Sequence, residues 1–100
     1  LTYVQEHYQE KILLEDIACF LHLSPKYFSR YFKKQFGHSF TEYVNSYRVE
    51  RSLSMLEDKN YSISETALQN GFESLSYYVK VFRSVMGMTP GEYRKQINDE

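Results

Sequence analysis

Apolar residues recur along the chain at helical intervals, separated by short polar stretches. The longest such segment spans residues 40–57, where one face carries apolar or small side chains at i, i+3, i+4 and i+7: Val49, Ser52, Leu53 and Leu56. A helix of that length rises about 27 Å at ~1.5 Å per residue, which favours a rod between two lobes. The pattern predicts an all-α fold with about seven helices, near residues 2–9, 14–21, 25–36, 40–57, 63–70, 75–86 and 90–97.

Residues typical of helix ends mark the boundaries of these segments. Three hydroxyl residues are each followed three positions later by a glutamate, the order of a capping box: Ser39 and Glu42, Ser62 and Glu65, and Thr89 and Glu92. Pro25 and Pro90 each follow a hydroxyl residue and suit the first helical position, where the missing N–H costs nothing. Gly37 and Gly87 follow apolar runs, where a left-handed residue would end each helix.

The two halves of the chain repeat each other in residue type, order and spacing. The pair Ile17-Ala18 matches Thr66-Ala67 at an offset of 49, and from the tyrosines onward the offset is 50. At that offset Tyr27-Phe28-x-Arg30-x-Phe32-Lys33 matches Tyr77-Tyr78-x-Lys80-x-Phe82-Arg83, and Gly37-x-Ser39 matches Gly87-x-Thr89. The change of offset places one extra residue in the turn of the second copy. A repeat of this kind predicts two copies of one structural unit.

Each copy combines a short helix, a tight turn and a longer helix, which is the order of a helix-turn-helix unit. The turns span residues 22–24 and 71–74, and each needs a left-handed residue. Gly71 adopts that conformation freely, and histidine, here His22, is among the few other types that tolerate it. Apolar side chains lie on one face of each unit: Leu23, Phe28 and Phe32 in the first, and Phe72, Tyr78 and Phe82 in the second.

The opposite face of each longer helix carries hydrogen-bonding and cationic groups, which a reader of the major groove needs. Net charge is −1 and the pI about 6.3, which alone argues against nucleic acid. The distribution of charge argues the other way, because residues 24–41 and 74–91 carry bases while all 13 acids lie elsewhere. The alternative is a helical module whose solvated faces bind a protein partner such as polymerase.

The order of these residues resembles the AraC/XylS family of bacterial transcription regulators. The second half carries Ala67, Gly71-Phe72, Ser74, Ser76-Tyr77-Tyr78, Lys80, Phe82-Arg83, Gly87, Thr89-Pro90 and Tyr93-Arg94 in the family's order. The first half agrees at Ile17-Ala18, Ser24-Pro25, Tyr27 through Arg30, Phe32 through Lys34, Gly37, Ser39-Phe40 and Arg48-Val49. The resemblance implies two helix-turn-helix subdomains, residues 1–38 and 59–100, joined rigidly by a linker helix at 39–58. Both recognition helices would enter successive major-groove segments on one face of double-stranded DNA.

The resemblance also assigns roles to single residues. It places base-facing side chains at Lys26, Ser29, Arg30, Leu75, Ser76, Val79 and Lys80. We expect phosphate contacts from Ser24, Tyr27, Lys33, Lys34, Tyr77 and Arg83. Arg30 is the strongest candidate base reader, because its fork matches guanine O6 and N7; the alternative is a phosphate contact. Leu75 and Val79 are apolar where the family is more often polar, so they either pack on thymine methyls or leave the second unit with mainly backbone contacts.

Three further residues depart from the family or invite a structural role. Leu13 stands where the family usually has a capping hydroxyl, so the helix at 14–21 should begin with a poor cap. Ser52 replaces a usual alanine, which we expect to be harmless packing. Arg48 is expected to pair within the rod rather than contact DNA.

The sequence gives no sign of catalysis, and we expect no enzyme, cofactor or metal site. His7, His22 and His38 lack ligand spacing, and no phosphate-binding loop or recognisable nucleophile is present. Cys19 follows Ala18 in a packed helix and is expected to be buried and inert. No apolar run is long enough for a membrane span. The family resemblance implies a cytoplasmic regulator that contacts RNA polymerase and is fused to a sensing or dimerisation domain absent from this chain.

Overall fold

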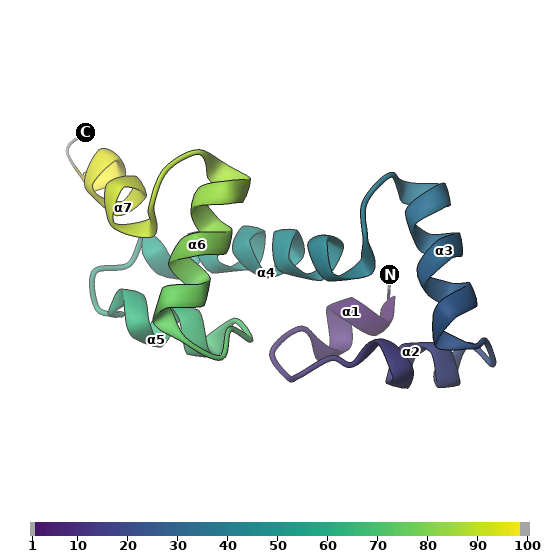
Figure 1. The fold of residues 1–100 in the computed structure, drawn as a ribbon. Coiled ribbons are helices and arrows are strands. Elements are labelled where there is room, and N and C mark those ends of the chain that lie inside the picture. The colour runs from purple at the N-terminus through teal and green to yellow at the C-terminus, as the bar shows by residue number, and fades with distance from the viewer. Residues whose placement is uncertain (1, 99–100) are drawn as a thin grey trace.

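The computed structural model describes residues 2–98, which form seven α-helices. They are α1 (Thr2–His7), α2 (Leu14–Phe20), α3 (Pro25–Phe36), α4 (Phe40–Leu56), α5 (Ile63–Gln69), α6 (Leu75–Met86) and α7 (Pro90–Asn98). The molecule is elongated, 48 × 22 × 21 Å, with α1–α3 at one end of the α4 rod and α5–α7 at the other (Figure 1). The predicted all-α architecture is confirmed, with helix ends within two residues of their predicted positions. None of the described helices is long and apolar enough to cross a bilayer.

The helix ends form as their residues predict. Each capping box closes, with the Ser39 hydroxyl accepting from the Glu42 N–H at 3.1 Å and the Ser62 hydroxyl from the Glu65 N–H at 2.9 Å. Gly37 and Gly87 end α3 and α6 in the left-handed conformation, each at φ 77°. The start of α2 is the exception, because Leu13 provides no side-chain hydrogen bond there.

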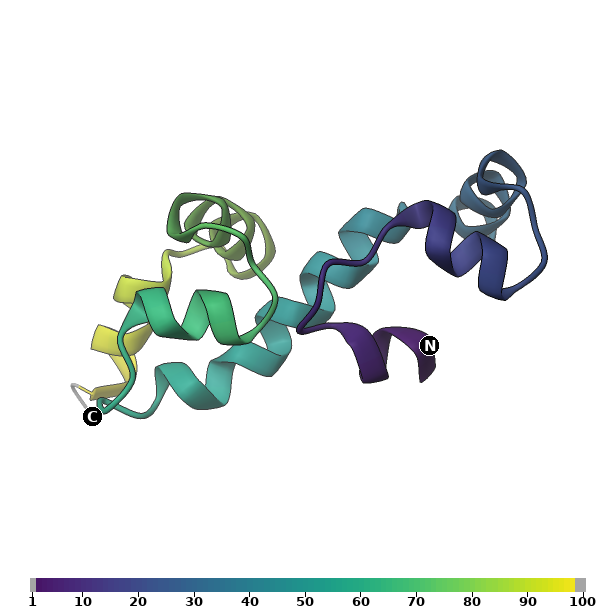
Figure 2. The ribbon, with the colours of Figure 1, turned by 90° about the horizontal axis from the view of Figure 1, so that it is seen from below.

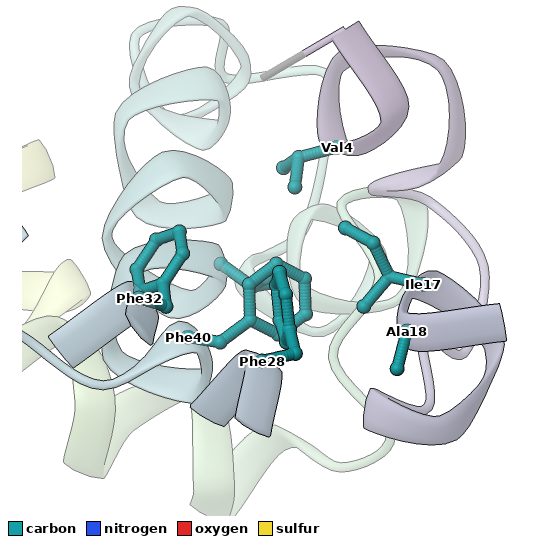
Figure 3. Packing of buried hydrophobic residues seen from close by; sticks show 7 residues of the cluster. Val4, Ile17, Ala18, Phe28, Phe32 and Phe40 are labelled. Atoms are coloured by element: carbon teal, nitrogen blue, oxygen red, sulfur yellow. The ribbon is translucent and has the colours of Figure 1, made fainter. Parts of the chain in front are cut away.

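The rod divides its buried residues between two hydrophobic cores. Phe40 and Val44, in its first half, pack with residues of α1, α2 and α3: Val4, Ile17, Ala18, Phe28 and Phe32. Val49 and Leu56, in its second half, pack with residues of the other end: Ala67, Phe72, Tyr78 and Phe82. Figure 3 shows the first core, where the rings of Phe28, Phe32 and Phe40 gather opposite Val4 and Ile17. Each fully buried aromatic ring contributes about 1.5–3 kcal/mol relative to an exposed one.

The two halves of the rod occupy different structural positions in the two repeats. Its first half serves the first core as α7 serves the second, because Tyr43 meets Phe32 edge-on at 5.5 Å and Tyr93 meets Phe82 edge-on at 5.8 Å. Its second half takes the place in the second core that α1 takes in the first. The repeats are therefore fused through a helix that each needs to complete its core.

Candidate nucleic-acid interface

The first candidate recognition helix, α3, is set at its N-terminus by Ser24. The Ser24 hydroxyl accepts from the Tyr27 N–H at 3.1 Å, and Pro25 occupies the first helical position. Phe28 and Phe32 are buried against the core. Because Arg30 lies two positions from each of them, about 200° around the helix, it points away from the core. The predicted DNA-contacting residues of this unit are all exposed: Ser24, Lys26, Tyr27, Ser29, Arg30, Lys33 and Lys34.

The second candidate recognition helix, α6, is built the same way. The Ser74 hydroxyl accepts from the Tyr77 N–H at 3.1 Å, and Tyr78 and Phe82 are fully buried. The predicted contacting residues Leu75, Ser76, Tyr77, Lys80 and Arg83 are exposed, and Val79 is half-buried. Leu75 leaves 42 % of its surface open at the start of α6, where the first unit has Pro25, and Val79 stands where the first unit has Ser29.

The two helices share an orientation relative to the rod. Figure 1 shows α3 and α6 standing across α4 in the same direction, with their N-terminal ends on the same side. Figure 2, seen from below, shows both nearly end-on along one edge of the molecule, α6 beside the rod and α3 at its far end. Two parallel helices along one edge of a molecule can enter one DNA duplex from one face.

The two matched tyrosines near the helix starts differ in their surroundings. Tyr27 is 57 % exposed and stacks on Tyr31 with ring centroids 6.3 Å apart. Tyr77 is 41 % exposed, and its hydroxyl accepts from the Asn45 side-chain amide of the rod at 2.9 Å. A hydroxyl that accepts one hydrogen bond keeps its own proton to donate, so Tyr77 still has the chemistry for a phosphate contact.

The turns hold the predicted left-handed residues, His22 at φ 60° and Gly71 at φ 92°. Gly71 also lies at a close approach, because a Cβ added there would collide with the Tyr8 carbonyl and lie 2.8 Å from the Arg48 Nε. Glycine is therefore required in the second turn for space as well as for conformation.

Three sequence-based expectations need correction. Cys19 is exposed rather than buried, because α2 turns Ile17 and Ala18 to the core and the residues that follow to solvent. Ser52 is more than packing, since its buried hydroxyl donates to the Val49 carbonyl at 2.6 Å and bonds the Tyr78 hydroxyl at 2.8 Å. Arg48 is structural as expected, but its partners are carbonyls beyond α1 and not groups of the rod.

Tyr8 and Asn45, which connect the two subdomains, are not among the residues predicted from the sequence. The pair Ser52 and Tyr78 does carry a sequence signal, because a polar residue interrupts the apolar stripe of the rod and the second repeat has Tyr78 where the first has Phe28. Burial raises the pKa of Tyr78 to about 12, while its bond to Ser52 acts in the opposite direction, so the hydroxyl stays protonated at neutral pH.

Comparisons with known proteins agree with this geometry. A family model described as a helix-turn-helix domain matches residues 17–96. The regulatory protein PocR of Salmonella typhimurium is 40 % identical over 99 % of this chain, and the HTH-type transcriptional regulator YdeC of Bacillus subtilis is 40 % identical over 95 %. The chain spans 33 % of the length of each of these two relatives.

Solved structures share the fold closely. The DNA-binding domain of the transcriptional factor AdpA, in complex with a target DNA, superposes with a TM-score of 0.89 at 28 % identity, covering 98 % of this chain and 88 % of that one. The C-terminal domain of AraT, a response regulator from Geobacillus stearothermophilus, gives a TM-score of 0.86 at 32 % identity, covering 95 % and 79 %.

Proposed function

The chain belongs to the AraC-type helix-turn-helix family of transcriptional regulators, and on that premise we propose that it binds a specific duplex DNA site through α3 and α6 together. Each helix would lie in one of two successive major-groove segments on the same face of the duplex. The observation that carries the proposal is the parallel placement of the two capped helices along one edge of the molecule (Figures 1 and 2). The AdpA domain, with the same fold, is solved on its target DNA.

The first subdomain supplies most of the cationic contacts. On α3, Lys26, Ser29 and Arg30 would reach base edges, with Arg30 as the guanine reader. The flanking Lys33 and Lys34 would bind phosphates, together with Ser24 and Tyr27 at the start of the helix. Because no acidic residue lies in the first turn of α3, its N-terminal dipole adds to the attraction for the DNA backbone.

The second subdomain reads with a different chemistry. Leu75 and Val79 would pack on thymine methyl groups, while Ser76 and Lys80 offer a hydrogen-bond donor and a cation to neighbouring bases. Phosphate contacts would come from Tyr77 and Arg83. The proposed unit boundaries are residues 1–38 and 59–100, with the linker helix between them.

In the whole protein this domain would act in the cytoplasm without catalysing a reaction of its own. We propose RNA polymerase as its protein partner and a sensing or dimerisation domain as its covalent neighbour. The chain's share of its relatives, one third of each, leaves room for such a domain in proteins of their length.

The test combines affinity with footprinting. A duplex selected by this domain from a random library should be protected over two segments about one helical turn, ~34 Å, apart. Affinity should fall steeply with salt on both selected and random duplex, with a log–log slope of roughly −0.9 per phosphate neutralised. A module that binds only proteins would show neither the footprint nor the slope. Protection of a single segment would contradict reading by both helices.

A further inference from the structure

The rod has a waist between the two cores. Val44 is the last buried residue of α4 in the first core and Val49 is the first in the second core. Residues 45–48 therefore join the subdomains, and we call them the waist. A single helix bends and twists under load, so the relative orientation of two lobes joined only by a helix is weakly fixed.

Arg48, at the end of the waist, grips the loop that follows α1. Its Nε donates to the Tyr8 carbonyl at 2.8 Å, and its Nη2 donates to the Glu10 carbonyl at 2.7 Å. One planar guanidinium thus holds two backbone groups in fixed directions, which a lysine ammonium does not reproduce. Burial lowers the pKa of Arg48, and Glu73 and Tyr77 oppose that shift, but an arginine stays charged in proteins.

The gripped loop touches the second subdomain. Figures 1 and 2 both show the loop between α1 and α2 beside the turn between α5 and α6. The Gln9 side chain donates to the Gln69 carbonyl at 3.0 Å, and Gly71 packs against the Tyr8 carbonyl with no room for a Cβ. The loop is therefore clamped between Arg48 of the rod and the turn of the second helix-turn-helix unit.

Aromatic contacts and a second hydrogen bond strengthen the same region. The Tyr8 and Tyr47 rings meet edge-on with their centroids 5.3 Å apart, and the Arg51 guanidinium lies 5.7 Å from the centre of the Tyr8 ring. The Asn45 amide donates to the Tyr77 hydroxyl of α6. The waist thus contacts both the loop of the first subdomain and the recognition helix of the second.

We propose that Arg48 is a positioning residue that sets the spacing and rotational phase at which α3 and α6 meet DNA, by clamping the Tyr8 loop against the Gly71 turn. The proposal rests on the proposed function, because the rotational phase between α3 and α6 matters only if both helices bind the same duplex. Two attachments across the waist, the rod and the clamp, resist the twist that the rod alone would permit. The domain then selects half-site spacing as well as base sequence.

Arg94 provides a matched control within the chain. Its Nε donates to the Leu56 carbonyl at 2.9 Å, and its Nη2 donates to the Tyr61 carbonyl at 2.7 Å and the Asp58 carbonyl at 3.4 Å, so it also holds backbone groups through one guanidinium. These carbonyls lie at the end of the rod and in the loop before α5, at the same end of the molecule as Arg94 itself. Arg94→Lys therefore removes the same kind of bonds without touching the clamp.

The experiment measures affinity against half-site spacing. The probes are a duplex selected by the wild-type domain and two derivatives with one base pair added or removed between the protected segments, which shifts the second segment by about a tenth of a turn. Wild type should bind the derivatives about tenfold more weakly or worse. The ratio of the affinity for the selected duplex to that for each derivative should fall several-fold in Arg48→Lys. Arg94→Lys should weaken binding to all three duplexes alike and leave this ratio unchanged.

A distance measurement tests the clamp without DNA. Spin labels on Cys19, the chain's one cysteine and exposed on α2, and on Ser84→Cys in α6 report the separation of the two ends. The distance distribution should broaden in Arg48→Lys and keep its wild-type width in Arg94→Lys. Gln9→Ala, which leaves Arg48 in place, should broaden it less, and it decides the question if Arg48→Lys does not fold by circular dichroism.

The outcomes separate the two proposals. Wild-type spacing ratios and distance widths in folded Arg48→Lys, or in Gln9→Ala where Arg48→Lys does not fold, would overturn the clamp while leaving two-helix binding intact. A wild-type domain that binds all three duplexes equally would instead contradict the proposed function itself.

Discussion

The first core buries Phe28 where the second buries Tyr78, so only the second core has a phenol hydroxyl to satisfy at this position. In the second core the rod offers the Ser52 hydroxyl to the Tyr78 hydroxyl at 2.8 Å, so the buried phenol is satisfied. In this molecule the core accepts a polar group because the facing element supplies its hydrogen-bond partner. The substitution at one position of the repeat is therefore linked to the residue on the rod.

The two turns differ as strongly as the two cores. His22 is an exposed left-handed residue at one end of the molecule, whereas Gly71 is left-handed and packed against the Tyr8 carbonyl of the other subdomain. The second turn thus serves both its own helices and the contact between subdomains. Equivalent positions in a repeat carry different constraints when only one of them faces a neighbour.

The largest expected effect is the loss of stability in Gly71→Val, and its comparison with Gly37→Val separates the turn contact from backbone strain. Gly71→Val places a β-branched residue at positive φ, which costs about 1–3 kcal/mol, and adds a collision with the Tyr8 carbonyl. Gly37→Val is the matched control, because its φ is also positive but a Cβ there has no neighbour within 4 Å. Urea unfolding followed by circular dichroism should show Gly71→Val losing clearly more stability. Equal losses would mean that the Tyr8 contact constrains nothing.

The next comparison concerns matched positions of the two recognition helices. Arg30→Ala should cost ~1–3 kcal/mol on the selected duplex and much less on random DNA, because base edges differ between sequences and phosphates do not. Lys34→Ala should weaken both kinds of DNA alike and reduce the salt slope by about one unit. Lys80→Ala, at the position of α6 that matches Arg30, tests whether the second helix also reads bases. The measurement is fluorescence anisotropy on both duplexes at several salt concentrations.

The quantity that decides this comparison is the ratio of the affinity for the selected duplex to the affinity for random duplex. If Arg30→Ala lowers both affinities by the same factor, Arg30 binds phosphate, and specificity in the first unit rests on Lys26 and Ser29. If Lys80→Ala behaves as Lys34→Ala does, the second unit contributes mainly backbone contacts.

The polar pair of the second core gives a smaller, graded effect on stability. Ser52→Ala leaves the buried Tyr78 hydroxyl without its partner and should cost about 1–3 kcal/mol in unfolding free energy. Tyr78→Phe reproduces the first core and leaves Ser52 bonded to the Val49 carbonyl, so it should cost only about 0.5–1.5 kcal/mol. The double variant should be close to Tyr78→Phe alone. Strictly additive losses would show that the two hydroxyls do not depend on each other.

The smallest effect concerns the starts of the two short helices, α2 and α5. Leu13 already has the extended backbone of an N-cap, at φ −98° and ψ 140°, and is 42 % exposed, so Leu13→Ser should stabilise the first subdomain by ~1 kcal/mol. Ser62→Ala removes the corresponding cap of α5 and should destabilise the second subdomain by about the same amount. Thermal melts of both variants check the opposite signs. A Leu13→Ser variant no more stable than wild type would mean that the serine does not cap α2.

Much of this molecule was predictable because the relevant interactions are local in the chain. Helical periodicity and capping boxes each involve residues a few positions apart, so the helices, their ends and the outward face of α3 follow from the residues alone. The left-handed turn residues follow as well, since His22 and Gly71 are among the types that adopt positive φ. The role of each exposed residue on DNA remains a proposal.

The seven helices, the repeat and the acid-free segments at 24–41 and 74–91 follow from the order of residues alone. Long-range packing was needed to show that Ser52 bonds Tyr78, 26 residues away, and that Arg48 donates to carbonyls 38 and 40 residues before it. It also turned Cys19 outward, because the crossing of α2 on the first core, and not the periodicity of α2, chose which residues face solvent. Contacts of this kind depend on how packed elements meet, and local spacing carries no information about that meeting.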